Sequence, residues 1–345
     1  MLLKNKEAFK RKVQEYIDSG YVRRKKHPTH DLWIYNYTPK CQYAEFWDEI
    51  TLNCRGLILD SDYEIVAKPF EKFFNLEQVK AEDIPSSDYK IYEKMDGSLG
   101  ILYWLDDEPH IATRGSFDSV QALRATELLQ TKYREYIKYL KRGWTYLFEI
   151  IVAESKVVIE YDKEYLVLIG VINNATFRDE TLVDIGFPIA QSYAGTKDFR
   201  ELKQLNTKGK EGFVVHFEDG FRVKIKFEEY VRVHKLRTSI SNLAVWENLK
   251  CGFDFNELLE DIPDEMFDWI KKVKEKLERQ YAEIEAVAKF EFKVFETRKE
   301  AAEYFKKCSY PRILFLMLDA RDYSELIWNR VRPKEFLKPR NLMNN

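Results

Sequence analysis

The chain has 345 residues, of which 45% are hydrophobic and 33% are charged, a balance typical of folded globular proteins and not of disordered ones. Its formal net charge of −2 excludes a general attraction to nucleic acid, so phosphate binding would need a local basic surface. The four cysteines lack the spacing of a zinc site or disulfide framework, and no stretch approaches the roughly 20 apolar residues of a membrane span, so we expect a cytoplasmic protein (in the host cytoplasm if it is viral).

The first predicted element is an amphipathic helix over residues 6–19, because Phe9, Val13 and Ile17 recur every four residues and Gly20 follows. From about residue 50 to 226, short β-branched and aromatic runs alternate with Asp, Gly and Pro, which indicates strands joined by turns. The turns in DDEP (106–109) and EDG (218–220) predict hairpins, and one helix at about 120–140 interrupts the strands. This pattern predicts a mostly antiparallel α+β fold.

After about residue 240 the strand pattern stops. Residues 266–292 predict a long amphipathic helix, and RILFLMLDA (312–320) could be a buried helix or a strand. The change of period predicts two domains, 1–240 and 241–345. The apolar positions expected on the buried face of the long helix are Ile270, Val273, Leu277, Tyr281, Ile284 and Val287.

Polar residues stand at the ends of several predicted strands. In KMDGS (94–98), a lysine precedes an Asp-Gly pair between two strand-like runs, which predicts a hairpin-type turn with glycine at positive φ. Each such group is a weak signal alone, because a K-x-D-G sequence often marks a plain turn. The polar and glycine candidates at strand ends are Arg55, Gly56, Lys72, Lys94, Asp96, Gly97, Arg114, Gly115, Glu149, Glu211, Gly212, Lys224 and Lys226.

Taken together and in this order, these segments resemble the covalent nucleotidyltransferases, the superfamily of polynucleotide ligases and mRNA capping enzymes. KMDGS looks like motif I with its nucleophilic lysine, LFEII (147–151) like motif III, EGFVV (211–215) like motif IV and VKIKF (223–227) like motif V. Four further segments narrow the resemblance to the RNA ligase 1 family of T-even bacteriophages: IYNY, CRGLILD, KPFEKFFNLEQ and YVRVH. RILFLMLD is similar to the helical C-terminal domain of that family, whereas motif Ia ends in Arg114 where the family can have lysine.

The resemblance implies an antiparallel-sheet nucleotidyltransferase domain of the ATP-grasp-like ligase kind, residues 1–240, followed by an all-helical C-terminal domain, residues 241–345, which could select the RNA. The implied activity is that of an ATP-dependent RNA ligase with a covalent lysyl-AMP intermediate and an RNA-adenylate, serving RNA repair. Its expected substrate is single-stranded or broken-loop RNA with 5′-phosphate and 3′-hydroxyl ends, and its expected form is a monomer.

The resemblance also assigns roles to individual residues. Catalysis falls to Lys94, with Asp96, Gly97, Lys224 and Lys226. Glu149 and Glu211 would hold Mg²⁺, for which Mn²⁺ could substitute. The residues expected to bind ATP are Tyr37, Arg55, Lys72, Glu93, Lys94, Arg114, Phe148, Glu149, Glu211, Lys224 and Lys226, with Arg55 and Lys72 on the triphosphate, Arg114 and Glu149 on the ribose, and Phe148 stacked on adenine.

A nucleophilic lysine requires a special environment, because an ordinary lysine is almost wholly protonated at neutral pH and has no lone pair with which to attack. Burial and nearby positive charge favour the neutral amine. We therefore expect Lys224, Lys226 and Mg²⁺ to converge on Lys94, where the same charges would draw in the triphosphate.

Several candidates also have a purely structural interpretation. Phe148 could be a core aromatic residue, Glu149 a strand carboxylate paired with an arginine, and Lys224 and Lys226 a solvated edge that discourages aggregation. His216 is interpreted as a strand residue with a satisfied hydrogen bond. The basic run RRKKH (23–27) could contact RNA phosphates or form a solvated loop face.

Two alternative functions are open to such a chain. A capping-type guanylyltransferase also uses a K-x-D-G lysine, but capping enzymes and DNA ligases carry a strand-rich OB-fold after motif V, where this sequence predicts helices. A non-catalytic RNA-binding protein with a nucleotide pocket would be expected to lack at least one essential group, and every charged motif position that can be matched is present.

Overall fold

The computed structural model describes residue 3 and residues 5–152, 163–193, 198–205, 210–227, 230–231, 241–252 and 264–333. The chain divides into two compact units, Met1–Arg237 and Thr238–Asn345. The boundary predicted near residue 240 and the last three residues of YVRVH lie outside the described residues. In the part of the chain that is described, no helix has the length and apolar character needed to cross a membrane.

The described strands of the first unit form three sheets. All pairings are antiparallel except that of β13 with β5, so the fold is mixed α+β with largely antiparallel sheets, as predicted. In sheet order, the strands are β1 (Val22–Lys26), β2 (Leu32–Tyr37), β3 (Arg55–Asp60) and β4 (Ile65–Ala67); β10 (Tyr165–Asn173), β9 (Trp144–Ile151), β7 (Ser98–Leu105) and β8 (Glu108–Ala112); and β11 (Ser192–Tyr193), β6 (Tyr89–Lys94), β12 (Gly212–Phe217), β13 (Arg222–Lys226) and β5 (Phe74–Asn75).

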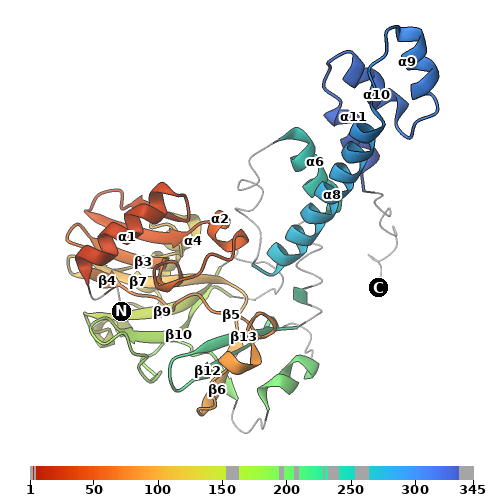
Figure 1. Ribbon diagram of the computed structural model, residues 1–345. Coiled ribbons are helices and arrows are strands. Elements are labelled where there is room, and N and C mark those ends of the chain that lie inside the picture. Colours follow the sequence, from red (N-terminus) through yellow and green to blue (C-terminus); the bar gives the residue numbers. More distant parts are fainter. Residues whose placement is uncertain are drawn as a thin grey trace. The chain divides into compact units, whose positions relative to one another are not determined.

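Helices cover the sheets of this unit (Figure 1). The predicted N-terminal helix is α1 (Lys6–Asp18), which packs Phe9 and Val13 against the sheet of β2 and β3. The helix predicted at 120–140 is shorter: α4 (Val120–Gln130) ends where the hydroxyl of Thr131 donates to the carbonyl of Glu127 at 2.6 Å, and a 3-10 helix (Arg134–Tyr139) follows. Two short helices, α2 (Pro39–Tyr43) and α3 (Glu49–Asn53), join β2 to β3.

Apolar side chains join the first two sheets into one core. Ile34 and Ile58 of the first sheet pack with Ile101, Tyr103 and Leu147 of the second. On its other face the second sheet packs against α4. The predicted hairpins at DDEP and EDG are confirmed, since β7 pairs with β8 and β12 pairs with β13.

The KMDGS segment is not a hairpin turn, and that prediction is wrong. The strand before the segment, β6, pairs with β11 and β12, and the strand after it, β7, pairs with β8 and β9. The segment therefore carries the chain from one sheet to another. Gly97 is not among the glycines with positive φ. A Cβ atom at Gly97 would lie 2.5 Å from the carbonyl oxygen of Ile150 and 3.0 Å from Cγ of Glu149. Glycine is needed here because the chain passes tightly over β9.

None of the described residues of the second unit is in a strand. RILFLMLDA lies largely in a helix, α10, which begins with proline at its first position, where the missing N–H costs no hydrogen bond. On the long helix, α8, the prediction fails at Val287, which is 39% exposed, because Ala288 occupies the buried face instead. The helices are α6 (Asn242–Cys251), α8 (Asp264–Glu291), α9 (Arg298–Phe305), α10 (Pro311–Leu318) and α11 (Ser324–Arg330).

Candidate functional site

One buried carboxylate lies between two lysines of the third sheet. Nζ of Lys94 is 2.7 Å from Oε2 of Glu211, and Nζ of Lys226 is 2.6 Å from Oε1 of the same residue. Strand register explains the meeting, because Gly212 at the start of β12 pairs with Lys94 on one side and Lys226 on the other. Residues far apart in the sequence thus converge at the ends of three adjacent strands.

Gly212 makes this close arrangement possible. Its φ of +152° is disfavoured for residues with a side chain, and a Cβ atom there would lie 2.0 Å from the carbonyl oxygen of Ile225. Any larger residue would force β12 away from β13, and with it Glu211 from Lys226.

A second carboxylate, Glu149, reaches the same region from β9 of the second sheet. Its Oε1 accepts a hydrogen bond of 3.1 Å from the backbone N–H of Gly97, in the segment that follows Lys94. Removal from water raises the pKa of Glu149 to about 7; the charge of Lys94 opposes this shift and the charge of Glu211 adds to it. Near neutral pH this carboxyl group is therefore poised between its neutral and charged forms.

Glu211 behaves in the opposite way. Burial alone would raise its pKa, but the charges of Lys226 and Lys94 outweigh burial and hold the pKa of Glu211 below its ordinary value. One of the two carboxylates is thus firmly ionised and the other is not, although their charges interact.

The lysines of β13 are interior residues. β13 lies between β12 and β5, and Lys224 is only 7% exposed, so the alternative of a solvated edge is wrong. The structure also modifies the expectation that cations surround Lys94. Lys226 reaches the same carboxylate as Lys94, so that positive and negative groups alternate across the site.

Aromatic rings surround Lys72. Its Nζ is 5.5 Å from the ring centroids of Tyr37, Trp47 and Phe74, and the residue is 6% exposed. Nη1 of Arg114 donates to the hydroxyl of Tyr37 at 3.0 Å, so two predicted nucleotide ligands are in direct contact. The sequence analysis missed Trp47; only the fold brings this indole beside Lys72.

Asp96 anchors the segment after Lys94. The hydroxyl of Tyr230 donates to Oδ1 of Asp96 at 2.7 Å, and Asp96 is 3% exposed. Tyr230 opens the YVRVH segment, so a sequence signal for it existed, although its contact could not be foreseen.

Two predicted ligands do not join the cluster. Side chains alternate along a strand, so Phe148 points away from the face that carries Glu149, and it is fully buried against Phe187, with ring centroids 4.9 Å apart. A ring in that position cannot stack on a base bound near Glu149; its alternative role, a core aromatic residue, is the one that the structure shows. Glu93 directly precedes Lys94 on β6, so its side chain lies on the opposite face of the sheet from that of Lys94. Its carboxylate accepts hydrogen bonds from Lys210 at 2.8 Å and from Tyr193 at 3.0 Å.

An apolar cluster on the Glu149 face was not predicted. Ile151, two residues after Glu149, packs with Val167 and Ala190, and Met95 and Ile169 are partly buried against them. Met95 directly follows Lys94, so this cluster adjoins the lysines and carboxylates.

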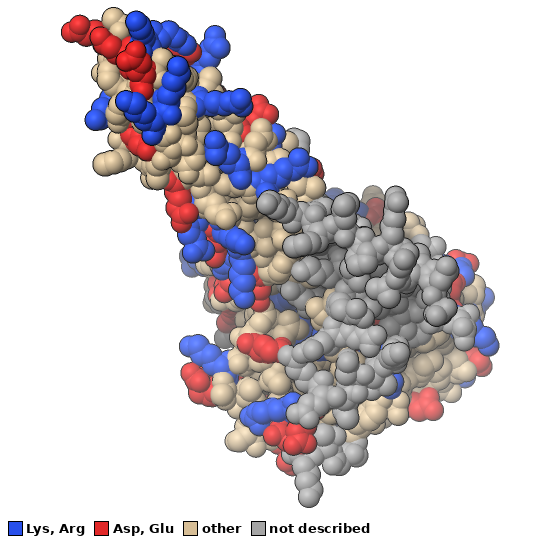
Figure 2. All heavy atoms as spheres, turned by 90° about the vertical axis from the view of Figure 1, so that its right-hand side faces the viewer, with Lys and Arg blue, Asp and Glu red and all other residues tan. Residues whose placement is uncertain are grey.

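The remaining candidates lie elsewhere. RRKKH forms most of β1 and so is not a loop. Its arginines and lysines are exposed and His27 is buried, and Lys25 and Lys26 pair with Asp118 and Asp31. His216 is a strand residue whose Nε2 is 3.4 Å from Oδ2 of Asp179, as interpreted from the sequence. On the face shown in Figure 2, charges of both signs are interspersed, in keeping with the small net charge.

Glu149 and Glu211 are the two carboxylates that could hold a metal at this site. Among the described residues, no group of three or more His, Cys, Asp and Glu side chains is arranged to bind a metal ion. Mg²⁺ commonly takes one or two protein carboxylates and completes its shell with phosphate oxygens and water. The pair therefore suits a metal that arrives with a phosphate ligand.

Many protein families have a mixed α+β fold with lysines and carboxylates at the ends of strands. Comparison with known families shows to which of them this chain belongs. A family model described as RNA ligase matches residues 53–230, slightly more than half of the chain. The chain therefore belongs to this RNA ligase family.

The curated relatives agree with this membership. The chain is 28% identical over 282 residues to an Autographa californica nuclear polyhedrosis virus protein assigned as a bifunctional polynucleotide kinase/RNA ligase, covering 73% of the chain and 40% of that protein. It is 27% identical over 183 residues to the RNA ligase of Rhodothermus phage RM378, covering 41% of each. The matched regions thus span about 40% of the length of these two relatives.

Solved structures of a Naegleria gruberi RNA ligase are also similar to part of the chain. A complex of that enzyme with ATP and Mn aligns with 45% of this chain and 53% of its own, at 19% identity and a TM-score of 0.36. A complex with AMP and Mn aligns with 48% of this chain and 57% of its own, at 17% identity and a TM-score of 0.38.

Proposed function

We propose that this protein is an ATP-dependent RNA ligase that joins 5′-phosphate and 3′-hydroxyl RNA ends through a covalent lysyl-AMP intermediate. One observation carries the proposal: in a chain of the RNA ligase family, Lys94 and Lys226 share the buried carboxylate of Glu211 beside a second carboxylate, Glu149. Such a cluster can bind a triphosphate, hold a metal and provide a nucleophile.

In the first step, Nζ of Lys94 would attack the α-phosphorus of ATP. The ammonium group first gives up one proton to solvent, because only the neutral amine has a lone pair. A nitrogen–phosphorus bond then forms, the bond from that phosphorus to the leaving pyrophosphate breaks, and the nitrogen releases a second proton to solvent. Lys94 must first leave Glu211, to which it donates at 2.7 Å. Because Lys226 holds the other oxygen of Glu211, the carboxylate keeps a cationic partner when Lys94 departs. Lys226 therefore lowers the cost of releasing the nucleophile.

Glu149 and Glu211 would hold Mg²⁺, or Mn²⁺ in its place. When bound, the metal supplies positive charge against the triphosphate. The donor set fits this role, since both groups are carboxylates and the raised pKa of Glu149 reflects burial without enough nearby positive charge.

Other residues would position the nucleotide. Arg55 and Lys72 would contact the triphosphate, with Lys224 and Lys226 adding charge, and Arg114 and Tyr37 would lie near the ribose. In place of Phe148, the cluster of Ile151, Val167 and Ala190 with Met95 and Ile169 offers an apolar surface for adenine. Asp96 and Gly97 would hold the segment after Lys94 in place through Tyr230 and the backbone contact with Glu149.

Two transfers would complete the reaction. AMP passes from Lys94 to the 5′-phosphate of RNA as the phosphorus–nitrogen bond breaks and a pyrophosphate linkage forms. The 3′-hydroxyl then attacks the activated 5′-phosphate, releasing AMP and leaving a phosphodiester. In this proposal the first unit carries out the adenylyl transfer, the helical unit selects single-stranded or broken-loop RNA, the protein acts as a monomer, and the reaction serves RNA repair.

A labelling experiment tests the proposal against its rivals. Protein incubated with Mg²⁺ and α-labelled ATP should become covalently labelled, and α-labelled GTP should leave it unlabelled. Labelling by GTP alone would indicate a capping-type guanylyltransferase, and no labelling by either nucleotide would indicate a non-catalytic RNA-binding protein. The absence of strands from the described residues of the second unit favours the ligase, because the capping-type rival requires a strand-rich domain after motif V.

A further inference from the structure

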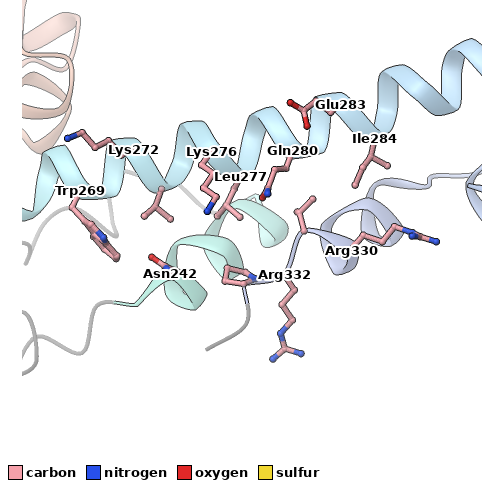
Figure 3. Close-up of a pocket in the computed structure, with 13 residues that line it drawn as sticks. Asn242, Trp269, Lys272, Lys276, Leu277, Gln280, Glu283, Ile284, Arg330 and Arg332 are labelled. Atoms are coloured by element: carbon pink, nitrogen blue, oxygen red, sulfur yellow. The ribbon is translucent and has the colours of Figure 1, made fainter. Parts of the chain in front are cut away.

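The helical unit contains a pocket of about 680 Å³ (Figure 3). One wall is a single face of α8, because its lining residues follow one another at helical spacing from Trp269 to Ile284. The opposite wall consists of Asn242 at the start of α6 and the segment from Arg330 to Pro333 at and after the end of α11.

Side-chain contacts hold these walls together. Nε1 of Trp246 on α6 donates to the carbonyl oxygen of Trp328 on α11 at 2.7 Å, and Nζ of Lys250 donates to Oδ1 of Asn329 at 3.0 Å. The ring of Trp328 also lies 4.7 Å, centroid to centroid, from that of Tyr281 on α8. The pocket is therefore formed by the packing of three helices before any ligand binds, which favours binding.

The lining is positively charged. It contains Lys272, Lys276, Arg330 and Arg332 but one carboxylate, Glu283, an excess of three positive charges in a chain whose net charge is −2. Among the described residues, no carboxylate forms an ion pair with any of these four cations. Other lysines of the same unit are paired: Lys250 with Glu325, Lys274 with Glu278 and Lys289 with Glu285. The guanidinium groups of Arg330 and Arg332 lie 5.1 and 5.2 Å from the ring centroids of Tyr310 and Trp246, contacts that leave their positive charge unneutralised.

The interior of the pocket is apolar and aromatic. Figure 3 shows Trp269, Lys276 and Gln280 pointing from α8 toward α6 and the opposite wall, whereas Arg330 and Arg332 extend outward from that wall. The apolar lining residues are Val273, Leu277, Ile284, Val331 and Pro333. An indole and an apolar floor suit a base, amide groups of Gln280 and Asn242 can hydrogen-bond to its edge, and the outer cations suit phosphates.

We propose that this pocket binds a segment of single-stranded RNA, with a base beside Trp269 and phosphates on Lys272, Lys276, Arg330 and Arg332. A volume of about 680 Å³ is sufficient for a base and its sugar, whereas a duplex keeps its bases stacked inside and offers only its backbone. In Figure 3, Lys272, Arg330 and Arg332 are directed away from the interior and Lys276 points into it, so positive charge continues from the interior to the edge. This placement favours a chain that enters and leaves over an enclosed small anion. The inference rests on the proposed function, because that function supplies RNA as the ligand.

The test compares two double variants of the full-length protein. Lys272→Ala with Lys276→Ala removes two pocket charges, and Lys306→Ala with Lys307→Ala removes two exposed charges of the same unit outside the pocket lining. Binding of a short fluorescent single-stranded RNA is followed by anisotropy at several salt concentrations. The pocket variant should bind roughly tenfold more weakly, and the slope of log K against log salt should fall by about 1.4, since each phosphate contact on a single strand contributes about 0.7.

A second pair of variants tests the base contact. Trp269→Ala should weaken binding of single-stranded RNA, and Trp269→Phe should restore much of it, because a ring remains for stacking. Matched duplex RNA should bind the wild-type protein more weakly than the single strand and should not respond to either change. Thermal unfolding of all four variants shows whether the fold is kept.

The outcomes separate this inference from the proposed function. Equal affinity and salt slope in the two double variants would overturn it, as would competition by polyglutamate as effective as that by RNA, which would indicate an acidic protein partner. Equal binding of duplex and single strand would overturn the base contact. Self-labelling by ATP needs no RNA and should survive in both double variants; failure of the wild-type protein to label would overturn the proposed function, while RNA binding would still decide the role of the pocket.

Discussion

Lys94 and Lys226, on strands either side of β12, contact opposite oxygens of the same buried carboxylate, Glu211. The arrangement ties the candidate nucleophile to a second cation through a shared anion. It predicts that the two lysines act together: one leaves the carboxylate to react, and the other remains to hold it.

Lys94→Ala should abolish covalent labelling by ATP while the protein still folds, because Glu211 keeps its contact with Lys226. The measurement is transfer of label from ATP, together with circular dichroism for the fold. Lys90→Ala, which removes an exposed lysine from the same strand, is the control and should label normally. Retained labelling of the Lys94 variant would mean that another residue is the nucleophile.

Lys226→Ala should slow self-adenylylation by about 10²-fold or more, the loss typical of removing one group that stabilises the charge of a transition state. Without Lys226, Lys94 is the one cation among the described residues that remains ion-paired with Glu211, which therefore holds the nucleophile back. Supplying pre-adenylated RNA bypasses this step, so the variant should keep more activity with that substrate than with ATP. Equal losses with both substrates would contradict the role given to Lys226.

Glu149→Gln should raise stability at pH 8 and have little effect at pH 5. The folded pKa of about 7 lies above the ordinary value of 4.5, so the folded protein binds this proton more tightly than the unfolded chain. The contribution of this proton to the free energy of unfolding is fully present below pH 4.5 and is lost as the pH rises through 7. At 1.36 kcal/mol per pH unit, the free energy of unfolding differs between these two limits by up to about 3 kcal/mol. Glutamine keeps an oxygen for the N–H of Gly97.

Urea unfolding at the two pH values measures this effect. Glu211→Gln is the matched control with the opposite sign: because Lys226 and Lys94 lower the pKa of Glu211, its contribution is present above pH 4.5 and is lost as the pH falls through the folded value. That variant should be less stable than the wild-type protein at pH 8. A similar response of the two variants to pH would show that the environments of the two carboxylates do not differ as described.

Phe148→Leu should destabilise the protein, by less than the roughly 3–5 kcal/mol typical of Phe→Ala in a core, and leave ATP binding unchanged. The side chain is fully buried and packs on Phe187, on the opposite face of β9 from Glu149. Unfolding curves and nucleotide titration of the folded protein check this. A selective loss of ATP affinity at unchanged stability would restore the stacking role predicted from the sequence.

Trp47→Ala should raise the KM for ATP by about 2- to 30-fold, the equivalent of about 0.5–2 kcal/mol for one cation–π contact. Its ring is one of three that surround Lys72 at 5.5 Å, and without it the ammonium is less firmly positioned. Steady-state labelling at varied ATP measures the effect. Trp33→Ala removes a comparable contact with Lys26 at 5.3 Å and should leave the KM unchanged; a shift of similar size there would indicate a general loss of stability.

Local patterns were sufficient for much of the fold. The N-terminal helix, the two hairpins, the long helix and the α+β class follow from apolar spacing and turn residues, which act over a few neighbouring positions. The predictions were wrong where packing against residues distant in sequence determines which side chain is buried. Val287 continues the helical spacing, yet the packing of α8 buries Ala288 instead.

The candidate site likewise has features that the sequence predicts and features that depend on the tertiary structure. The order of the motifs identified Lys94, Glu149, Glu211, Lys224 and Lys226 as candidates, because residue type and order are properties of the chain itself. Tertiary structure decided which of them meet. Strand register joins Lys94, Glu211 and Lys226, strand alternation removes Phe148 and Glu93, and packing adds Trp47 beside Lys72. Contacts between segments more than a hundred residues apart depend on the pairing of strands, which no local pattern contains.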